Sequence, residues 1–318
     1  MKNRARTELT KSELIEQIPL ACCDELIAVE LLEQQRWGSN PTCVHCDSSA
    51  VYKMTDAATG ERSKRYLWRC RDCKKQYTVR IGTVYEESRL DLRHWCYAFW
   101  RAATSKKGVA ALEIMRHCQI SYKSALFLMN RIRFAMAPDD NQPKMTGTVE
   151  VDETYVGGKR RGVGRGNRDN KQPVVALVER GGRVHSFPVD RVTINNIVPV
   201  LRDRITHGAD LNTDESTIYK DMKPWFPFHK TVNHTEREYV RREGKRTITT
   251  NTVEGYFALV KRGINGIYHN VSHEYLERYL WQFGFLYNNR RMNDGERTAL
   301  AIKSAEGKRM MYRASVAQ

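Results

Sequence analysis

The chain has 318 residues, with 53 Lys and Arg against 37 Asp and Glu, which gives a formal charge of +16. A hydrophobic fraction of 41% excludes general disorder, and the absence of a long apolar run excludes a transmembrane helix. Because the first residues lack the apolar segment of a signal peptide, we expect a cytoplasmic protein with no membrane partner. There, such a charge favours nucleic acid as partner and association with the nucleoid, although a merely soluble basic protein is the simpler alternative.

Cysteine spacing identifies the first domain. Residues 1–34 are expected to form an N-terminal helical segment, and residues 35–86 contain two Cys-x2-Cys pairs among short strand-like segments. Each pair can place two thiolates on one metal ion, so two pairs complete a tetrahedral site. Redox-active or simply buried pairs are the alternative, but a cytoplasmic chain does not favour disulfides. The pattern predicts a zinc ribbon with one structural Zn²⁺ held by Cys43, Cys46, Cys70 and Cys73.

Residues 87–138 change to a helical period. Three helices are expected, the second across residues 108–115 and the third after Ser121, which can cap it. The third helix carries basic and amide side chains on its polar side, as the recognition helix of a helix-turn-helix does. We therefore expect Lys123 and Arg131 to contact DNA. A purely structural helical connector is the alternative.

Residues 144–292 have the pattern of a mixed α/β domain, after a polar segment bounded by prolines. The predicted order is three strands, a helix, a strand, a helix, a strand and a long helix that starts near Thr252. This is the order of an RNase H-like domain with a mixed sheet. The predicted fold class is therefore multidomain: a zinc ribbon, a helix-turn-helix-like segment and an RNase H-like α/β domain, followed by a basic C-terminal tail at residues 293–318.

Three acidic residues lie where such a domain holds metal ions. Asp152 is expected at the end of the first strand and Asp214 at the end of the fourth, and Glu254 lies in the long helix. For any single acid, a turn or a helix cap is the simpler explanation. Carboxylates gathered from distant segments repel one another unless divalent cations neutralise them, and Mg²⁺ prefers oxygen ligands. We predict that the three acids are catalytic and bind two Mg²⁺ or Mn²⁺ ions, with Asn251 as a rival third ligand.

Further expectations concern the surroundings of this site. Glu150 should share the Asp152 side of the strand at greater depth, whereas Glu153 should face away. Lys261 follows Glu254 by two helical turns on the same line, so we expect it to act in catalysis by binding a DNA phosphate. A basic, glycine-rich stretch is also expected to bind phosphates, although a solvated surface explains such a run equally well. Its predicted DNA contacts are Lys159, Arg160, Arg161 and Arg165.

Several stretches of the sequence resemble those of a known family. They are residues 151–159 (VDETYVGGK), 213–215 (TDE), 232–234 (VNH), 251–263 (NTVEGYFALVKRG), 266–272 (GIYHNVS) and 287–291 (YNNRR). From about residue 35 to 291, the chain is similar to bacterial insertion-sequence transposases that join an N-terminal zinc ribbon to a DDE catalytic domain. The resemblance implies a transposase that acts on the terminal inverted repeats of its own mobile element. Some members of that family use Asn as the third ligand.

The predicted reaction is metal-dependent cleavage at the element ends, followed by strand transfer into target DNA. We expect a homo-oligomer to carry it out on DNA. One alternative is a non-enzymatic DNA-binding regulator built on the zinc ribbon and the helix-turn-helix, which leaves the three acids without a purpose. Another is an RNase H-like nuclease that cuts without strand transfer, which sequence does not distinguish from a transposase.

Overall fold

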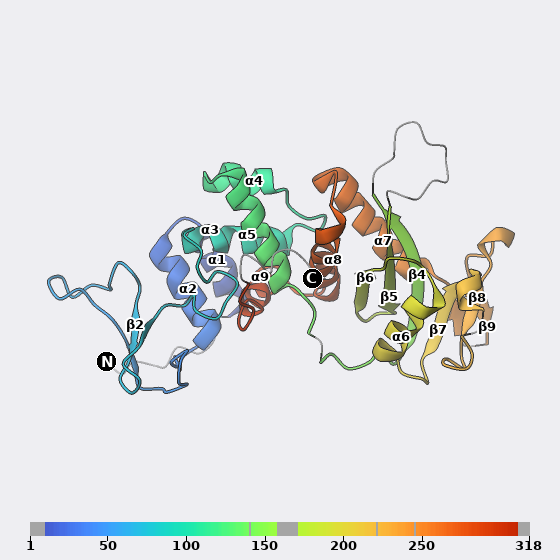
Figure 1. Ribbon diagram of the computed structural model, residues 1–318, viewed down its shortest axis with the longest axis horizontal. Helices are drawn as coiled ribbons and strands as arrows, with labels where there is room; N and C mark the ends of the chain where they lie inside the picture. Colours follow the sequence, from blue (N-terminus) through green and yellow to red (C-terminus); the bar gives the residue numbers. More distant parts are fainter. Residues whose placement is uncertain (1–9, 140, 158–170, 221, 245, 311–318) are drawn as a thin grey trace. The chain divides into compact units, whose positions relative to one another are not determined.

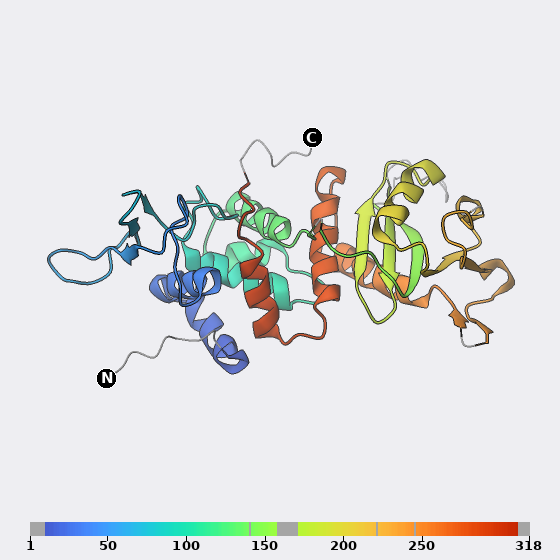
Figure 2. The same cartoon turned by 90° about the horizontal axis from the view of Figure 1, so that it is seen from below.

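The computed structural model describes the chain at residues 10–139, 141–157, 171–220, 222–244 and 246–310 (Figure 1, Figure 2). The chain divides into two compact units. The first unit joins the chain up to Met136 with the chain from Arg290 onward, and the second contains residues 137–289. No helix in the described segments is long and apolar enough to span a membrane.

Helices make up most of the first unit. They are α1 (Lys11–Ala21), α2 (Glu25–Trp37), α3 (Leu92–Thr104), α4 (Ala111–Cys118), α5 (Tyr122–Ala135) and α9 (Asp294–Lys303). α3 packs against α1, α2, α5 and α9, with Trp95 and Phe99 fully buried. As predicted, Ser121 caps α5, because its Oγ accepts a hydrogen bond from the Ser124 N–H (3.1 Å).

The helix predicted over residues 108–115 begins later than expected. α4 starts at Ala111, because Gly108 has a φ of 96° and Ala110 is extended, with a φ of −73° and a ψ of 142°. Residues 119–121 connect α4 to α5, and Gln119 adopts a left-handed conformation with a φ of 53°. The two helices thus form a pair joined by a tight turn.

The zinc-ribbon segment contains a small antiparallel sheet. Its strands are β1 (Val51–Lys53), β2 (Trp68–Cys70) and β3 (Gln76–Tyr77), in the order β1-β2-β3. Trp68 and Tyr77 are paired across β2 and β3 and are buried against Trp37 at the end of α2. The Trp68 indole N–H also donates to the buried carboxylate of Glu33 (2.7 Å). One face of the ribbon is therefore packed against α2.

Residues 294–303 form a helix, α9, where the sequence suggested part of a separate basic tail. Asn293 and Glu296 form a capping box that starts α9, and Ala301 and Ile302 on this helix are buried. α9 packs on α3, where the Arg297 Nε–H donates to the carbonyl oxygen of Ala103 (2.5 Å). The helix completes the first unit, and the whole second unit is inserted in the chain between α5 and α9.

Arg131 does not lie on a DNA-facing side of α5, in contrast to the prediction. Its side chain is buried, and its guanidinium donates to the carbonyl oxygens of Val84 (2.7 Å), Glu86 (2.7 Å) and Met310 (2.9 Å). The segments that follow the ribbon and α9 enclose α5, so a position on its expected polar side is buried. Arg131 therefore joins three segments of the first unit.

Replacing Arg131 with Ala should lower the free energy of unfolding by about 3 kcal/mol, because three carbonyl groups lose their charged donor. Denaturant unfolding of the full chain measures the change. Lys123→Ala is the matched control, since this exposed lysine lies in the first turn of the same helix. An Arg131→Ala protein that is as stable as the control would contradict the structural role.

A five-stranded mixed sheet forms the centre of the second unit. Its strands are β4 (Thr148–Val156), β5 (Gln172–Glu179), β6 (Val184–Pro188), β7 (Asp210–Asp214) and β8 (Lys230–Val232). The spatial order is β6-β5-β4-β7-β8. β5 is antiparallel to β4 and β6, whereas β4, β7 and β8 run parallel to one another. The five strands predicted from the sequence are all present.

Helices cover both faces of this sheet (Figure 1). They are α6 (Ile194–Arg204) on one face, and α7 (Asn251–Gly263) and α8 (His273–Asn288) on the other. Shorter elements are 3₁₀ turns at Thr217–Tyr219 and His234–Glu236, a π-helical turn at Ile264–Tyr268, and an unpredicted hairpin of β9 (Arg241–Glu243) and β10 (Arg246–Ile248). The three-layer arrangement buries apolar side chains on both sides of the sheet.

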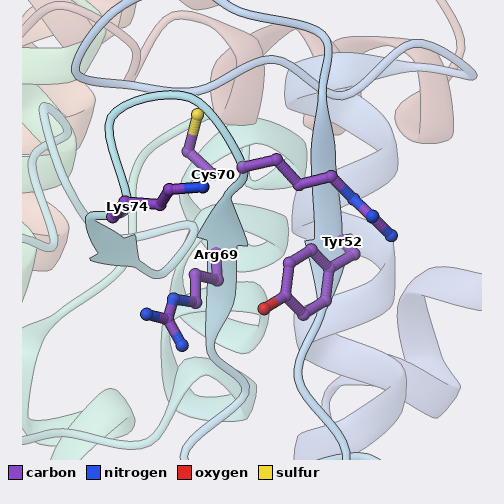
Figure 3. Close-up of a pocket in the computed structure, with 5 residues that line it drawn as sticks. Tyr52, Arg69, Cys70 and Lys74 are labelled. Atoms are coloured by element: carbon purple, nitrogen blue, oxygen red, sulfur yellow. The ribbon is translucent and has the colours of Figure 1, made fainter.

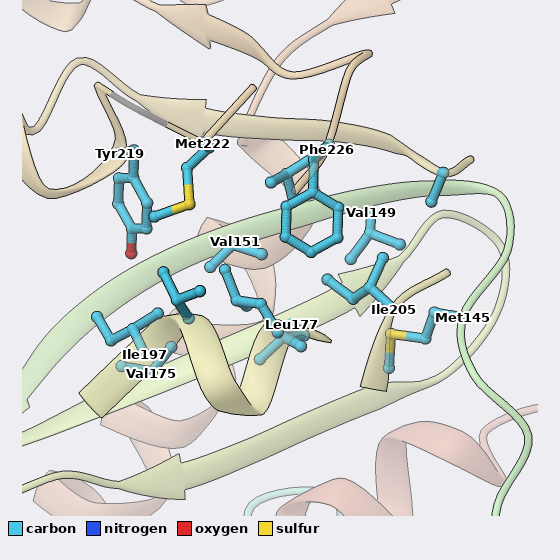
Figure 4. Packing of buried hydrophobic residues seen from close by; sticks show 14 of the residues in the cluster. Met145, Val149, Val151, Val175, Leu177, Ile197, Ile205, Tyr219, Met222 and Phe226 are labelled. Carbon is cyan, nitrogen blue, oxygen red and sulfur yellow. The ribbon is translucent and has the colours of Figure 1, made fainter. Parts of the chain in front are cut away.

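Alternation along β4 decides which of its residues face α7. Val149 and Val151 belong to the apolar cluster on the α6 side, where Figure 4 shows them beside Ile197 of α6 and Leu177 of β5. Residues at the even positions of β4 therefore face the α7 side. This alternation places the acidic residues of β4 relative to the helices.

Candidate functional site

Four cysteine sulfurs converge in the ribbon. The Sγ atoms of Cys43 and Cys73 lie 3.6 Å apart, those of Cys46 and Cys70 lie 3.7 Å apart, and all four lie within 4.8 Å of one another. Four sulfurs bound tetrahedrally at about 2.3 Å from a zinc ion would be separated by about 3.8 Å. The spacing therefore fits Zn²⁺. Because all four ligands come from the protein, the site is closed and structural.

The electrostatics of Cys70 also suit a metal ligand. Burial raises the pKa of this thiol, but hydrogen bonds from the backbone N–H groups of Cys73 and Asp72, together with its cysteine neighbours, lower the pKa to about 7. The Asp72 N–H lies 3.4 Å from the Cys70 sulfur. A thiolate is the form that binds zinc, so the backbone prepares this ligand for the ion.

Asp152 and Asp214 are placed side by side by the register of the central sheet. Glu150 of β4 pairs with Asn212 of the parallel strand β7. Asp152 and Asp214 each lie two residues further along, so they reach the same height and face the same side of the sheet. That side is the one covered by α7. The structure thus brings the first two predicted acids together.

Glu254 lies in the first turn of α7, and 45% of its side chain is exposed. Its Oε1 accepts a hydrogen bond from the Thr250 hydroxyl (2.8 Å). Burial raises the pKa of Asp152 to about 7, and the charges of Glu153, Asp214 and Glu254 act in the same direction. Burial likewise raises the pKa of Asp214. The three predicted acids therefore lie within electrostatic range of one another.

The carboxylates form a looser group than the cysteines. Among the described residues, the four cysteines are the one cluster in which three or more possible ligand atoms all lie within 4.8 Å of one another. Asn251, the rival third ligand, is the exposed first residue of α7. Lys261 is exposed near the end of the same helix.

Glu150 connects the strand of the first acid to the helix of the third. Its fully buried carboxylate accepts hydrogen bonds from the N–H groups of Thr252 (2.7 Å) and Val253 (3.1 Å) and from the Thr252 hydroxyl (2.9 Å). It also accepts from the Arg180 Nε–H (2.6 Å), which forms an ion pair. A carboxylate at a helix N-terminus interacts favourably with the unpaired N–H groups and the helix dipole. Glu150 therefore fixes the start of α7.

The alternation predicted for β4 is visible in these contacts. Glu150 is buried on the α7 side, whereas Glu153 accepts a hydrogen bond from the Tyr219 hydroxyl (2.9 Å) in the apolar cluster on the α6 side. Both orientations agree with the sequence prediction.

His234 lies between the second and third acids, and sequence reasoning gave it no role. Its Nε2 lies 3.2 Å from the Thr250 hydroxyl oxygen and 3.5 Å from Glu254 Oε1. Its charge acts to lower the pKa of Asp214, against the dominant effect of burial. Glu215 accepts hydrogen bonds from the His234 N–H (2.7 Å) and the Thr235 hydroxyl (2.6 Å), which fixes this turn. The sequence feature that could have pointed to this histidine is the VNH stretch at residues 232–234.

Comparison with known proteins identifies the family. Residues 144–288 match the family model of the ISXO2-like transposase domain, and residues 24–76 match that of the transposase zinc-ribbon domain. The chain is also 30% identical over 273 residues to an uncharacterised protein in transposable element ISH50 of Halobacterium salinarum, covering 80% of this chain and 88% of that protein. The chain belongs to the insertion-sequence transposases. No solved structure matches this transposase.

Of the DNA contacts predicted for the transposase, some are exposed, one is buried, and the others lie outside the described residues. Lys123 and Lys261 are exposed, as a DNA contact requires. Arg131 is buried and its terminal guanidinium nitrogens donate to carbonyl oxygens within the first unit, so it is not a DNA contact in this fold. The remaining predicted contacts lie outside the described residues: Lys159, Arg160, Arg161 and Arg165.

The purified transposase should contain about one equivalent of zinc per chain, and Cys70→Ser should remove most of it, because one of four ligands is lost. Metal analysis of the full chain measures the zinc content. Cys96→Ser is a suitable control, since Cys96 is buried in α3 outside the metal cluster. Unchanged zinc in the Cys70 variant would show that the site is wrongly assigned.

Asp152→Asn should raise the Tm of the zinc-loaded transposase at pH 8 by about 5 °C in the absence of Mg²⁺ and Mn²⁺. Between about pH 4 and pH 7, folded Asp152 holds a proton that the unfolded chain has released, so its contribution to the free energy of unfolding falls as the pH rises. Asn does not titrate, so the variant's advantage should be much smaller at pH 4. Thermal unfolding without added Mg²⁺ or Mn²⁺ at both pH values measures this difference. An equal Tm difference at both values would rule out the raised pKa.

Proposed function

We propose that this transposase is a DDE enzyme that cleaves DNA at the ends of its element and joins those ends to target DNA. The observation that carries the proposal is the placement of Asp152 and Asp214 at one height on parallel strands, beside Glu254 of α7. The order β6-β5-β4-β7-β8, with β5 antiparallel to the other strands, supports an RNase H-like fold for this unit.

The donor set suits divalent cations. Asp152, Asp214 and Glu254 are hard oxygen ligands in a partly buried site, and mutual repulsion contributes to the raised pKa of Asp152. Within the described part of the chain, these carboxylates have no Lys or Arg ion-pair partner, and Glu254 has only His234. We infer that they hold two Mg²⁺ or Mn²⁺ ions. When bound, such ions activate a water or 3′-hydroxyl nucleophile and stabilise the leaving oxygen.

The surrounding residues position this site and the DNA. Glu150 holds the start of α7, so Glu254 is fixed relative to Asp152. His234 contacts the Thr250 hydroxyl, which in turn donates to Glu254, so His234 helps to orient this carboxylate through Thr250. Lys261 lies two turns beyond Glu254, roughly 10 Å along α7, where it binds a DNA phosphate.

Recognition of the terminal inverted repeats is assigned to the first unit. The pairing of α4 and α5 through a short turn supports a helix-turn-helix, and Lys123 is exposed at the start of the second helix. The relative from ISH50 is described as part of a transposable element, which supports action on the DNA of such an element. A homo-oligomer bound to DNA in the cytoplasm, at the nucleoid, completes the proposal.

The test is cleavage of supplied element ends in Mg²⁺ and their joining to a supercoiled target. Asp152→Asn, Asp214→Asn and Glu254→Gln should each lower cleavage by about a thousandfold or more, because each removes a metal ligand, yet should still bind the ends. Glu274→Gln is the matched control, since this exposed glutamate occupies the first turn of α8 as Glu254 does in α7. Gel assays of binding, cleavage and joined product measure the three steps.

The outcomes separate the alternatives. If Asn251→Ala loses cleavage and Glu254→Gln retains it, the third ligand is the amide. Cleavage without joined product identifies a nuclease, and binding without cleavage by the unsubstituted protein identifies a DNA-binding regulator.

A further inference from the structure

The ribbon sheet has a polar face opposite the one packed on α2. Tyr52 of β1 pairs with Arg69 of β2, and Arg69 pairs with Gln76 of β3. These three residues alternate with the buried Trp68 and Tyr77, so they form a row on the solvent side of the sheet. The row crosses all three strands.

An open groove of about 420 Å³ lies on this face (Figure 3). Figure 3 shows Tyr52 and Arg69 extending side by side from neighbouring strands, with Lys74 on the turn that follows β2. The groove is lined by Tyr52, Arg69, Cys70, Arg71 and Lys74. Three of its five lining residues are therefore cations, and none is acidic.

The cations of the groove differ from those beside α2. There, Lys53 and Arg62 form ion pairs with the buried carboxylate of Glu33. By contrast, within the described residues no carboxylate lies within 4.0 Å of the cationic nitrogens that line the groove, on Arg69, Arg71 and Lys74. Unpaired cations gathered in a concave site attract an anion.

One of these cations is also held in place. The Arg71 guanidinium lies over the Tyr52 ring, 5.2 Å from its centroid, which is a cation–π contact. Tyr52 is 37% exposed, so its hydroxyl remains accessible beside the cations. A positioned guanidinium with a neighbouring lysine and hydroxyl can bind the oxygens of one or two phosphates.

We propose that this groove binds the phosphodiester backbone of duplex DNA, as a contact of the ribbon separate from those of α5 and of the catalytic site. The inference rests on the DNA-binding function proposed above, which supplies the polyanion that the unpaired cations match. Because the groove offers cations and a hydroxyl to phosphate oxygens, the contact adds affinity without base specificity.

The test compares two double variants of the full chain that remove the same charge. Arg71→Gln/Lys74→Gln alters the groove, whereas Lys64→Gln/Arg65→Gln removes one lysine and one arginine from exposed ribbon positions outside it. Binding to a labelled duplex of generic sequence, about 30 base pairs long, is measured over a range of salt concentrations. The groove variant should bind about tenfold more weakly, and its salt slope should be shallower by about two units, whereas the control should change little.

Each other result has a defined meaning. Equal losses in the two double variants, or no loss in the groove variant, would overturn the groove while leaving the proposed function intact. Failure of the unsubstituted protein to bind any duplex would instead refute the proposed function. Zinc content is measured in parallel. If the groove cations instead stabilise the zinc-binding thiolates, their removal acts on DNA binding through the loss of zinc. If the double variant loses zinc, Arg71→Gln and Lys74→Gln are tested singly, and loss of DNA binding only in zinc-depleted singles overturns the proposal.

Discussion

The second unit depends on one buried carboxylate, that of Glu150. Burying a charge is costly unless it is fully hydrogen-bonded, and here backbone N–H groups, a hydroxyl and a guanidinium supply the donors. Arg180 also donates to the carbonyl oxygens of Thr247 (2.5 Å) and Thr249 (3.1 Å), so the same ion pair secures the segment that leads into α7. The strand, the helix and their connection are therefore fixed at one point. These contacts therefore set the distance between Asp152 on the strand and Glu254 on the helix.

Much of the site could be predicted because its signals are local or periodic. The Cys-x2-Cys spacing determines which sulfurs can share an ion, and the structure brings all four together. The period of two in a strand separated Glu150 from Glu153 before their partners were known. Asp152 and Asp214 were found from the element order, which assigns one acid to the first strand and one to the fourth. Asp214 does end β7, but Asp152 lies in the middle of β4, because this strand continues to Val156. Each of these inferences follows from local spacing, from the period of one strand or from the order of the elements along the chain.

The residue roles that could not be predicted depend on contacts between distant parts of the sequence. Arg131 was assigned to DNA because α5 alone has an apolar stripe and a polar side, but Val84 and Met310 enclose that side in the fold. No local pattern indicates these acceptors. The role of Glu150 likewise requires knowing that α7 begins beside β4. In contrast, α9 was predictable, since Asn293 and Glu296 have the spacing of a capping box before apolar residues. The basic residues of this segment led instead to the prediction of a basic tail.

The insertion of the second unit between α5 and α9 affects how the protein is made. Ribosomal synthesis proceeds from the N-terminus, so domains generally fold in chain order. Here the first unit lacks α9 and the Met310 acceptor of Arg131 until almost the entire polypeptide has been translated. A chain that terminates early, through a frameshift or a nonsense codon, therefore contains an incomplete first unit. Because its first unit cannot be completed, we expect such a product to be degraded instead of competing with the full-length protein.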